Sequence, residues 1–341
     1  MRILGTVIIG LIILCIEVFL GIQSFYPQAL QKEQAGIVQK MIENKKTIVD
    51  ELSESELAWL AQNKVVHVGV DANFYPLETF NERGQYTGIG GDYLRLLTSM
   101  TGINFQTERQ QEWATVEELA QLKRIDMFMA VAKTDRRGEY LTFAEPYINL
   151  PGMIMVPRTN TASNLSLDDL RGKKLAVVKN YYWDDYVSAN YKDIERVPAS
   201  DTISAMHMVT NGQADAVIDY EFNLNEKIQV AGIYQLHTVG QVPSEFGHSI
   251  AVRSDLPELF SIISKALEHI TPDEQKVLIE SWLIQAKPAG NERRLQWYFF
   301  FFTQAILLIL LIISYTKSMT RKAVIAKAKE ARSQEHKPQI F

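Results

Sequence analysis

Apolar and polar residues alternate in short blocks along this 341-residue chain, and the period of each block predicts an element. Short apolar runs bounded by turn residues predict buried strands at 65–70, 127–132, 152–156, 174–178, 215–218 and 249–252. Apolar positions that recur every three or four residues predict helices at 91–100, 117–123, 182–189, 202–211, 221–230, 257–269 and 272–282. Strands that alternate with helices favour an α/β fold with parallel sheets.

The region before the first strand has a different pattern. Residues 28–52 place apolar side chains on one stripe at helical spacing, which predicts an amphipathic helix that packs on its own domain or on a second copy of the chain. Ser53 and Glu56 have the spacing of a capping box, which predicts a short helix over 56–62.

Two longer apolar segments, 3–22 and 295–315, are each about long enough to cross a bilayer. Trp297 and Tyr298 open the second segment, as interfacial aromatic residues do. A cleaved signal peptide is the alternative for the first segment, but its start carries only Arg2 and no Ala-x-Ala site follows it. We therefore expect an uncleaved anchor.

The charges after the second segment predict the orientation. This tail is rich in basic residues, namely Lys317, Arg321, Lys322, Lys327, Lys329, Arg332 and Lys337. Positive charge favours the cytoplasmic side, so both chain ends are expected inside and residues 26–294 outside.

Composition excludes several classes of function. With 47% hydrophobic and 22% charged residues the chain is globular, and a net charge of -5 gives no reason to expect a nucleic-acid partner. The single cysteine, Cys15, excludes an intrachain disulfide, and the six histidines show no ligand spacing. We expect neither a metal nor a cofactor.

The motifs are more specific than the composition. Thr134-x-x-Arg137, followed by Phe143 and Pro146-Tyr147, resembles the signature of the bacterial family 3 solute-binding proteins. The stretches Val68–Glu78, Leu170–Val178 and Asn211–Val217 resemble other parts of the same family, in the family's order. The Leu57-Ala58-Trp59-Leu60 prelude is similar to the membrane-anchored members found in sensor kinases and diguanylate cyclases.

The resemblance implies a two-lobed periplasmic-binding-protein type 2 fold, or Venus flytrap, flanked by two transmembrane helices. We expect an anchor at 1–25, an amphipathic linker at 26–55, the solute-binding domain at 56–287, a linker at 288–294, a second span at 295–316 and a basic tail at 317–341. Lobe 1 is expected over 64–157 and 240–285, and lobe 2 over 158–239. The chain would lie in the bacterial inner membrane with its binding domain in the periplasm.

The family's ligand residues point to a carboxylate site. The resemblance implies that Arg137 grips the carboxylate of an amino acid, and a planar guanidinium suits that role. Thr134 adds a hydroxyl or only stabilises the turn, while Arg136 is expected to be a solvated neighbour. Further expected contacts are Phe74, Tyr181 and Trp183 as apolar walls and Asp219 as the partner of an ammonium group. Because Ala130 and Ala132 replace the family's hydroxyl residues, a carboxylate other than an ordinary α-amino acid is the alternative ligand.

These features predict a binding protein and not an enzyme. The leading hypothesis is a sensor or receptor module that signals by hinge closure, as a homodimer or through a cytoplasmic partner. The alternative is the binding subunit of an amino-acid uptake transporter. A dehydratase or lytic transglycosylase relative is a third hypothesis, although no nucleophile–base pair is visible in the sequence.

Overall fold

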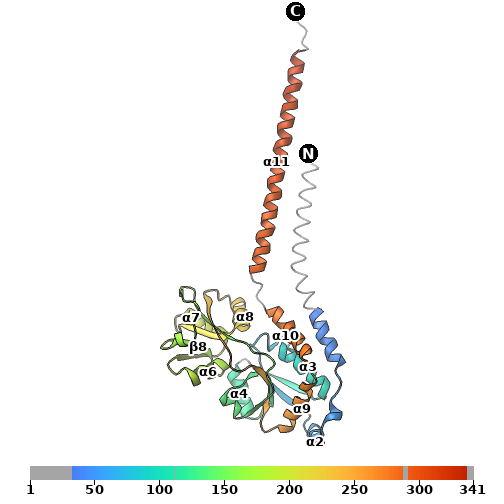
Figure 1. Ribbon diagram of the computed structural model, residues 1–341, viewed down its shortest axis with the longest axis vertical. Helices are drawn as coiled ribbons and strands as arrows, with labels where there is room; N and C mark the ends of the chain where they lie inside the picture. The colour runs from blue at the N-terminus through green and yellow to red at the C-terminus, as the bar shows by residue number, and fades with distance from the viewer. Residues whose placement is uncertain (1–32, 111, 287–290, 336–341) are drawn as a thin grey trace, which may run out of the picture. The chain divides into compact units, whose positions relative to one another are not determined.

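The computed structural model describes residues 33–110, 112–286 and 291–335, and the chain divides into two compact units, 1–287 and 288–341. The first unit contains two five-stranded sheets, which are described here as lobe 1 and lobe 2 (Figure 1). The second unit contains a single long helix, α11 (Asn291–Glu335).

Lobe 1 is built on the strand order β4-β1-β5-β12-β6. These strands are β1 (Val66–Asp71), β4 (Phe105–Gln110), β5 (Met127–Ala132), β6 (Leu141–Phe143) and β12 (His248–Arg253). β1 runs parallel to β4 and β5, whereas β12 runs antiparallel to β5 and β6. The sheet is therefore mixed, which corrects the expectation of a purely parallel one.

The central strand of lobe 1 is buried on both faces. Met127 and Met129 of β5 belong to one hydrophobic cluster, which also contains the apolar residues of α3 (Ile89–Thr101). Phe128, between them, belongs to a second cluster with Val116 of α4 (Trp113–Gln121). Because neighbouring side chains of a strand point to opposite faces, this explains why the β5 sequence is apolar throughout instead of alternating.

Lobe 2 is built on the order β11-β7-β10-β8-β9. Its strands are β7 (Gly152–Pro157), β8 (Lys174–Val178), β9 (Glu195–Ala199), β10 (Ala216–Tyr220) and β11 (Leu236–Val242), and its helices are α6 (Tyr182–Asn190), α7 (Thr202–Thr210) and α8 (Glu221–Ala231). β8 is parallel to β9 and β10, whereas β7 is antiparallel to β10 and β11. This sheet is also mixed.

The chain crosses between the lobes at 144–151 and 243–247, since β6 and β12 lie in lobe 1 while β7 and β11 lie in lobe 2. The expected lobe boundaries at 157 and 240 therefore need correction. The expected boundaries place β7 in lobe 1, but its backbone pairs with β10 and β11 of lobe 2. An apolar run shows that a strand is buried but not which sheet completes its hydrogen bonds.

The remaining elements are short or peripheral. They are η1 (Val49–Glu51), α2 (Glu54–Gln62), β2 (Thr79–Phe80), β3 (Tyr86–Thr87), α5 (Asp135–Gly138), η2 (Asp168–Leu170), α9 (Pro257–Glu268) and α10 (Pro272–Ala286). The expected capping box is confirmed at the start of α2, where the Ser53 hydroxyl and the Glu56 carboxylate each accept a backbone N–H from the other residue.

The continuous helix expected over 28–52 is wrong in its second half. Residues 33–44 are helical, and the chain then becomes irregular before η1. The Ile48 amide and the Thr47 hydroxyl both donate to the carbonyl of Met100, at distances of 2.9 and 3.1 Å, and the Ile48 side chain is buried. Contacts with the end of α3 therefore replace the last helical turns.

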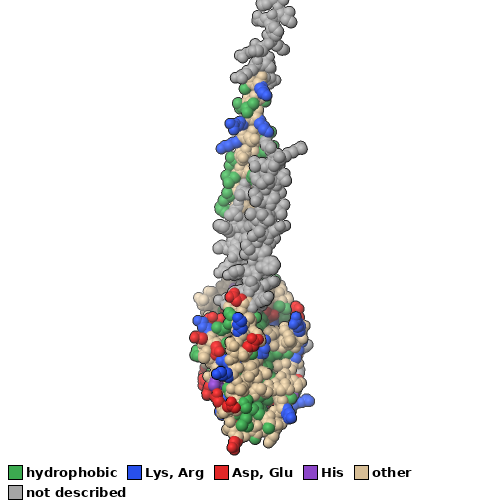
Figure 2. Space-filling model, turned by 90° about the vertical axis from the view of Figure 1, so that its right-hand side faces the viewer, with side chains coloured by type: hydrophobic (Ala, Val, Ile, Leu, Met, Phe, Trp, Pro, Cys, Tyr) green, Lys and Arg blue, Asp and Glu red, His purple; other side chains and the backbone are tan. Residues whose placement is uncertain are grey.

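The long helix α11 carries an apolar stretch followed by basic residues (Figure 2). Its exposed apolar residues include Phe301, Phe302, Ile306, Leu308, Ile309, Leu310, Ile312 and Ile313. Across 33–110, 112–286 and 291–335, no helix is both long and apolar enough to cross a membrane. The first expected span, 3–22, lies outside the described residues, and the second stays a prediction.

Candidate functional site

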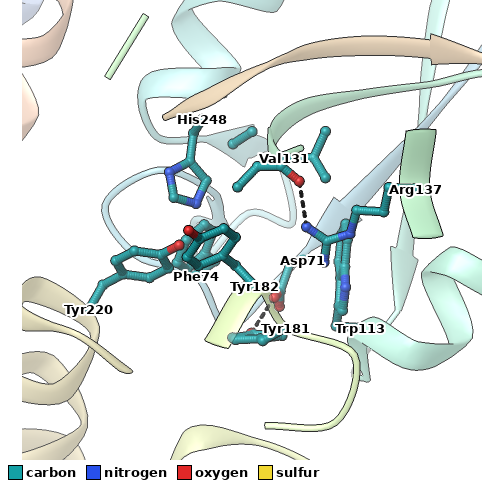
Figure 3. Close-up of a pocket in the computed structure, with 11 residues that line it drawn as sticks. Asp71, Phe74, Trp113, Val131, Arg137, Tyr181, Tyr182, Tyr220 and His248 are labelled. Atoms are coloured by element: carbon teal, nitrogen blue, oxygen red, sulfur yellow. Dashed lines mark hydrogen bonds between the residues drawn. The ribbon is translucent and has the colours of Figure 1, made fainter. Parts of the chain in front are cut away.

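A small cavity lies between the two lobes (Figure 3). Its lining residues are Asp71, Phe74, Trp113, Ala130, Val131, Ala132, Arg137, Tyr181, Tyr182, Tyr220 and His248. Most of them stand at or just beyond the carboxyl ends of β1, β5, β8 and β10, where α/β sheets commonly bind ligands. The cavity volume is about 20 Å³, which is room for roughly one water molecule, so the lobes are closed on each other.

Arg137 is placed by the short helix α5, which follows β5. The Thr134 hydroxyl caps this helix and accepts the Arg137 amide, so Thr134 has the turn-stabilising role that was one of its two expected functions. The Arg137 side chain is 3% exposed and lines the cavity. Its guanidinium lies 5.2 Å from the centre of the Trp113 ring.

Every nitrogen of the Arg137 guanidinium has a partner in the protein. Nε donates to Glu117 Oε1, Nη1 to the Ala132 carbonyl and Nη2 to the Asn180 carbonyl, each at 2.7 Å. Glu117 is 1% exposed, so this ion pair is fully enclosed. In the closed arrangement, the Asn180 carbonyl accepts the hydrogen bond from Arg137 Nη2 that a ligand carboxylate would otherwise accept.

Arg136 is not the solvated neighbour expected from the sequence. Its guanidinium donates to Glu117 in its own lobe and to Asp185 in lobe 2, with closest distances of 2.9 Å to each. The two carboxylates raise the Arg136 pKa although burial opposes them. Sequence position alone could not show this role, because Asp185 lies on a different lobe.

Three more hydrogen bonds join the lobes. The Thr134 hydroxyl donates to Asp185 at 3.0 Å, the Trp113 indole N–H donates to the Asn180 carbonyl at 3.0 Å, and the Tyr181 hydroxyl donates to Asp71. Asn180 has a φ of 64°, a left-handed conformation that asparagine tolerates better than most residues. Its carbonyl thereby accepts from Trp113 and both arginines.

Phe74 and Tyr181, both expected as apolar walls, line the cavity. Their ring centres are 6.0 Å apart, and Phe74 also packs on Tyr220 and His248 at 5.6 and 5.2 Å. Figure 3 shows the rings of Phe74, Tyr220 and His248 on the side of the cavity away from Arg137, and the Tyr181 ring beside Asp71. Whether they contact a ligand stays a prediction.

Trp183 and Asp219 are placed outside the cavity lining. Trp183 is 1% exposed. Its ring packs so closely against the backbone of Gly152 in β7 that any larger residue there would clash, so Trp183 belongs to the core of lobe 2. Asp219 accepts hydrogen bonds from Thr202, Asn223 and its neighbouring amide. Burial raises the Asp219 pKa to about 6, and these bonds oppose that shift.

The lining residues that the sequence analysis missed include Asp71, Trp113, Tyr182, Tyr220 and His248. Asp71 and Tyr220 end strands whose ends were expected near the site, so their positions could have suggested them. Trp113 and His248 come from α4 and β12. No local sequence pattern indicates which side of these elements faces lobe 2.

Burial shifts the pKa of two groups that line the cavity, Asp71 and His248. It raises the pKa of the Asp71 carboxyl, which the Tyr181 hydroxyl partly offsets. Burial lowers the His248 pKa to about 3, and the Arg137 charge acts in the same direction, so the imidazole is neutral at pH 7. His248 Nδ1 and the Tyr220 hydroxyl have no hydrogen-bond partner among the described residues, which leaves two neutral polar groups for a ligand.

Two sheets, two crossings and a cavity at the strand ends characterise a flytrap, and the family comparison agrees. Residues 66–285 match the bacterial extracellular solute-binding proteins, family 3. The chain belongs to this family. It carries a two-lobed ligand-binding flytrap domain.

The relatives of this family 3 domain include sensor proteins and free binding proteins. The virulence sensor protein BvgS of Bordetella pertussis is 32% identical over 236 residues, which cover 67% of this chain and 19% of BvgS. The L-arginine-binding protein of Pseudomonas aeruginosa is 25% identical over 178 residues, covering 51% of this chain and 68% of that protein.

The crystal structure of the periplasmic VFT2 domain of Bordetella pertussis BvgS has a TM-score of 0.58 at 28% identity. The match covers 67% of this chain and 98% of that domain. The family 3 domain of this chain is therefore similar to a periplasmic domain of a sensor protein. The chain spans only 19% of the full sensor relative, so the similarity concerns this domain alone.

Proposed function

We propose that this chain is a membrane-anchored periplasmic sensor module that binds a small carboxylate or amino-acid-like solute between its lobes and signals by hinge movement. The observation that carries the proposal is Arg137, a buried cation that lines an aromatic-walled cavity at the lobe interface. A buried guanidinium with fixed geometry is well suited to carboxylate recognition.

Binding requires the lobes to part, because a cavity of about 20 Å³ cannot hold an amino acid. Parting removes the Asn180 carbonyl from Arg137 Nη2 and from the Trp113 indole, which are its donors at 2.7 and 3.0 Å. A solute carboxylate replaces that carbonyl when the lobes close again. The ligand shifts the hinge equilibrium by the difference between its affinities for the open and closed states.

A chain of contacts links the cavity to α10. Phe74 lines the cavity, and the next residue, Tyr75, meets Trp282 of α10 edge-on with ring centres 6.4 Å apart. The Trp282 indole also donates to Asp92 of α3 at 2.8 Å. α10 precedes α11 in the chain, so movement at the cavity has a route toward the proposed second span.

The proposed anchoring rests on the two apolar segments of the sequence and on α11, whose exposed apolar stretch precedes basic residues. The output would pass to a homodimer partner or to a cytoplasmic protein. A second candidate function, the binding subunit of an amino-acid transporter, is favoured by the similarity to the L-arginine-binding protein. A second span counts against it, since a docking receptor needs at most one anchor.

The ligand proposal is tested with the full chain in a mild detergent, by thermal shift against L-amino acids and other small carboxylates. The matched pair is Arg137→Ala and Arg136→Ala, because in each variant Glu117 keeps the other arginine as a partner. Loss of one charge-assisted hydrogen bond costs about 1.5–3 kcal/mol, so Arg137→Ala should weaken binding by at least about tenfold. Arg136→Ala should change the affinity by less than about threefold.

Two outcomes contradict the ligand proposal. One is that no carboxylate stabilises the wild-type chain. The other is that Arg137→Ala binds the stabilising carboxylate as tightly as the wild type does, while both variants remain folded by circular dichroism.

The topology is tested by cysteine labelling in whole cells after the native Cys15 is replaced by serine. Asn190 and Lys327 are both exposed, so N190C and K327C offer accessible thiols. An impermeant reagent should label N190C in intact cells and K327C only after the inner membrane is opened. The reverse pattern contradicts the proposed orientation, and labelling of both contradicts the anchoring.

A further inference from the structure

A second, larger cavity lies on lobe 1, apart from the cavity between the lobes. Its volume is about 420 Å³, within the range of small-molecule sites. Its lining residues are Tyr93, Phe143, Ala144, Glu145, Pro146, Tyr147, Ile250, Phe260, Ser264, Leu267, Glu268, Ile270 and Gln275. None of them lines the interlobe cavity.

Aromatic side chains supply much of this lining. Tyr93 of α3 and Tyr147 pack with ring centres 4.7 Å apart and an interplanar angle of 30°. Phe143 and Phe260 also line the cavity. Aromatic ring faces carry partial negative charge, so they attract cations as well as apolar groups.

One buried polar group in this cavity is unsatisfied. Tyr93 is 2% exposed, and its hydroxyl has no hydrogen-bond partner of normal geometry among the described residues, although the Gln275 amide faces it. That amide donates to the Tyr147 carbonyl at 3.3 Å. A buried hydroxyl without a partner is costly, so a ligand that bonds to it gains affinity.

The charged residues of this cavity are all acidic. Glu145 and Glu268 line it and are exposed, and neither forms an ion pair within the described part of the chain. No Lys, Arg or His stands among the described lining residues. The cavity therefore favours a cation and disfavours a carboxylate, which is the opposite preference to that of the Arg137 site.

We propose that this cavity binds a small organic ammonium ion with an apolar or aromatic body. The body packs on Tyr147 and Phe260, and the ammonium group lies near the Tyr93 hydroxyl and between the two glutamates. Glu145 and Tyr147 belong to the 144–151 crossing between β6 and β7, so an occupant contacts one of the two segments about which the lobes move. The cavity is thus a regulatory site beside the hinge.

The test is calorimetric titration of the full chain in detergent with phenylethylammonium as the probe. Phenylacetate, which has the same ring and the opposite charge, is the matched ligand control. We expect saturable binding of phenylethylammonium and binding of phenylacetate at least about tenfold weaker, since two like charges oppose it.

Three variants locate the bound probe. Removing both rim charges in E145Q/E268Q should weaken binding of phenylethylammonium about tenfold, whereas E82Q/E118Q, which changes the net charge equally at exposed positions, should not. Tyr93→Phe should weaken binding without lowering stability, because the lost hydroxyl has no partner to leave behind. Ser264→Trp should fill the cavity and abolish binding.

The proposal is overturned by absence of saturable phenylethylammonium binding, by equal binding of phenylacetate, or by unchanged binding in E145Q/E268Q. Arg137→Ala separates this cavity from the interlobe site. Retained binding of phenylethylammonium in that variant supports a second site, and lost binding in a folded variant places the probe between the lobes and overturns it.

Discussion

The two lobes face the interlobe cavity with different chemistry. Lobe 1 supplies the buried carboxylate of Glu117, which Arg137 and Arg136 share. Lobe 2 supplies aromatic rings, the Asn180 carbonyl and Asp185. The Arg137 charge is therefore balanced by a residue of its own lobe, and opening of the hinge leaves that balance intact.

The contacts that cross the cavity are of another kind. They are single hydrogen bonds and one ion pair whose side chains are 34% and 18% exposed. The partly exposed ion pair contributes little to the closed state, so it can be broken at small cost. Lobe 1 therefore holds the Arg137 charge in place, and lobe 2 closes over it.

The largest effect should come from breaking the balance within lobe 1. Glu117→Ala removes the carboxylate from an enclosed ion pair and leaves Arg137 buried without a counter-charge, which should lower the free energy of unfolding by about 3–5 kcal/mol. Urea denaturation measures this change. The adjacent exposed Glu118→Ala is the control, expected to change stability by less than about 0.5 kcal/mol. Similar values for both would show that lobe 1 does not depend on this pair.

The second prediction concerns a buried acid of lobe 1 whose protonation is coupled to folding. Burial raises the Glu78 pKa to about 8, against the hydrogen bonds from Tyr86 and the Asp71 amide. Because the pKa of Glu78 is higher in the folded state, protonation of Glu78 stabilises the fold. This contribution to the free energy of unfolding is complete below pH 4.5 and is lost as the pH rises through 8. Stability measured by urea denaturation should therefore decline over that window.

Glu78→Gln should reduce that decline, and the part that remains comes from other buried carboxyls such as Asp219. A glutamine can accept the Asp71 amide and donate to the Tyr86 oxygen, which preserves both hydrogen bonds without a charge. The exposed Glu82→Gln should keep the wild-type pH profile. An unchanged profile in Glu78→Gln would mean that another group causes the pH dependence.

A smaller effect is expected from a single bond across the cavity. Tyr181→Phe removes the hydroxyl that donates to Asp71 in lobe 1, at a cost of about 1.5–3 kcal/mol to the closed state. X-ray scattering should show a larger radius of gyration for this variant. Tyr182→Phe is the control, because the Tyr182 hydroxyl accepts from the Glu245 amide in a crossing segment. Equal radii for both variants and the wild type would contradict a latch at Tyr181.

The smallest effect should come from the partly exposed ion pair between Arg136 and Asp185, which joins the lobes. Asp185→Ala removes the partner of Arg136 and Thr134, and exposed pairs contribute about 0.2–1 kcal/mol. A double-mutant cycle with Arg136→Ala isolates the coupling free energy. A coupling as large as that of Glu117 would erase the distinction between the two lobes.

The elements with strong periodicity were predictable from the sequence. β5, β8 and β10 are short apolar runs, and α3 and α9 have apolar residues at helical spacing, because burial on a fixed face requires these periods. The edge strands β6 and β11 were missed, and so were the edge strands β4 and β9. Their sequences, FQTERQ and ERVPA, are largely polar because an edge strand has only one neighbour and is partly solvated.

The candidate site was predictable only where one residue follows a buried strand. Arg137 follows β5 within a recognisable motif, and its place beside the cavity could be expected. Asp219 also stands near a strand end, but its carboxylate bonds to Thr202 and Asn223 of neighbouring helices. A position at the end of a strand therefore marks a residue as a candidate for the site, but it does not show whether the side chain points into the cavity.

The family, the two-lobed α/β class and Arg137 could be predicted from the sequence, since each depends on a local pattern or on motifs of fixed spacing. Three features required the folded chain: the place of β7 in lobe 2, the position of Glu117 between two arginines, and the Asn180 carbonyl that closes the cavity. The physical reason is that hydrogen-bond and charge partners are chosen by distance in space. Asn180 and Arg137 are 43 positions apart in the chain, yet their atoms meet at 2.7 Å.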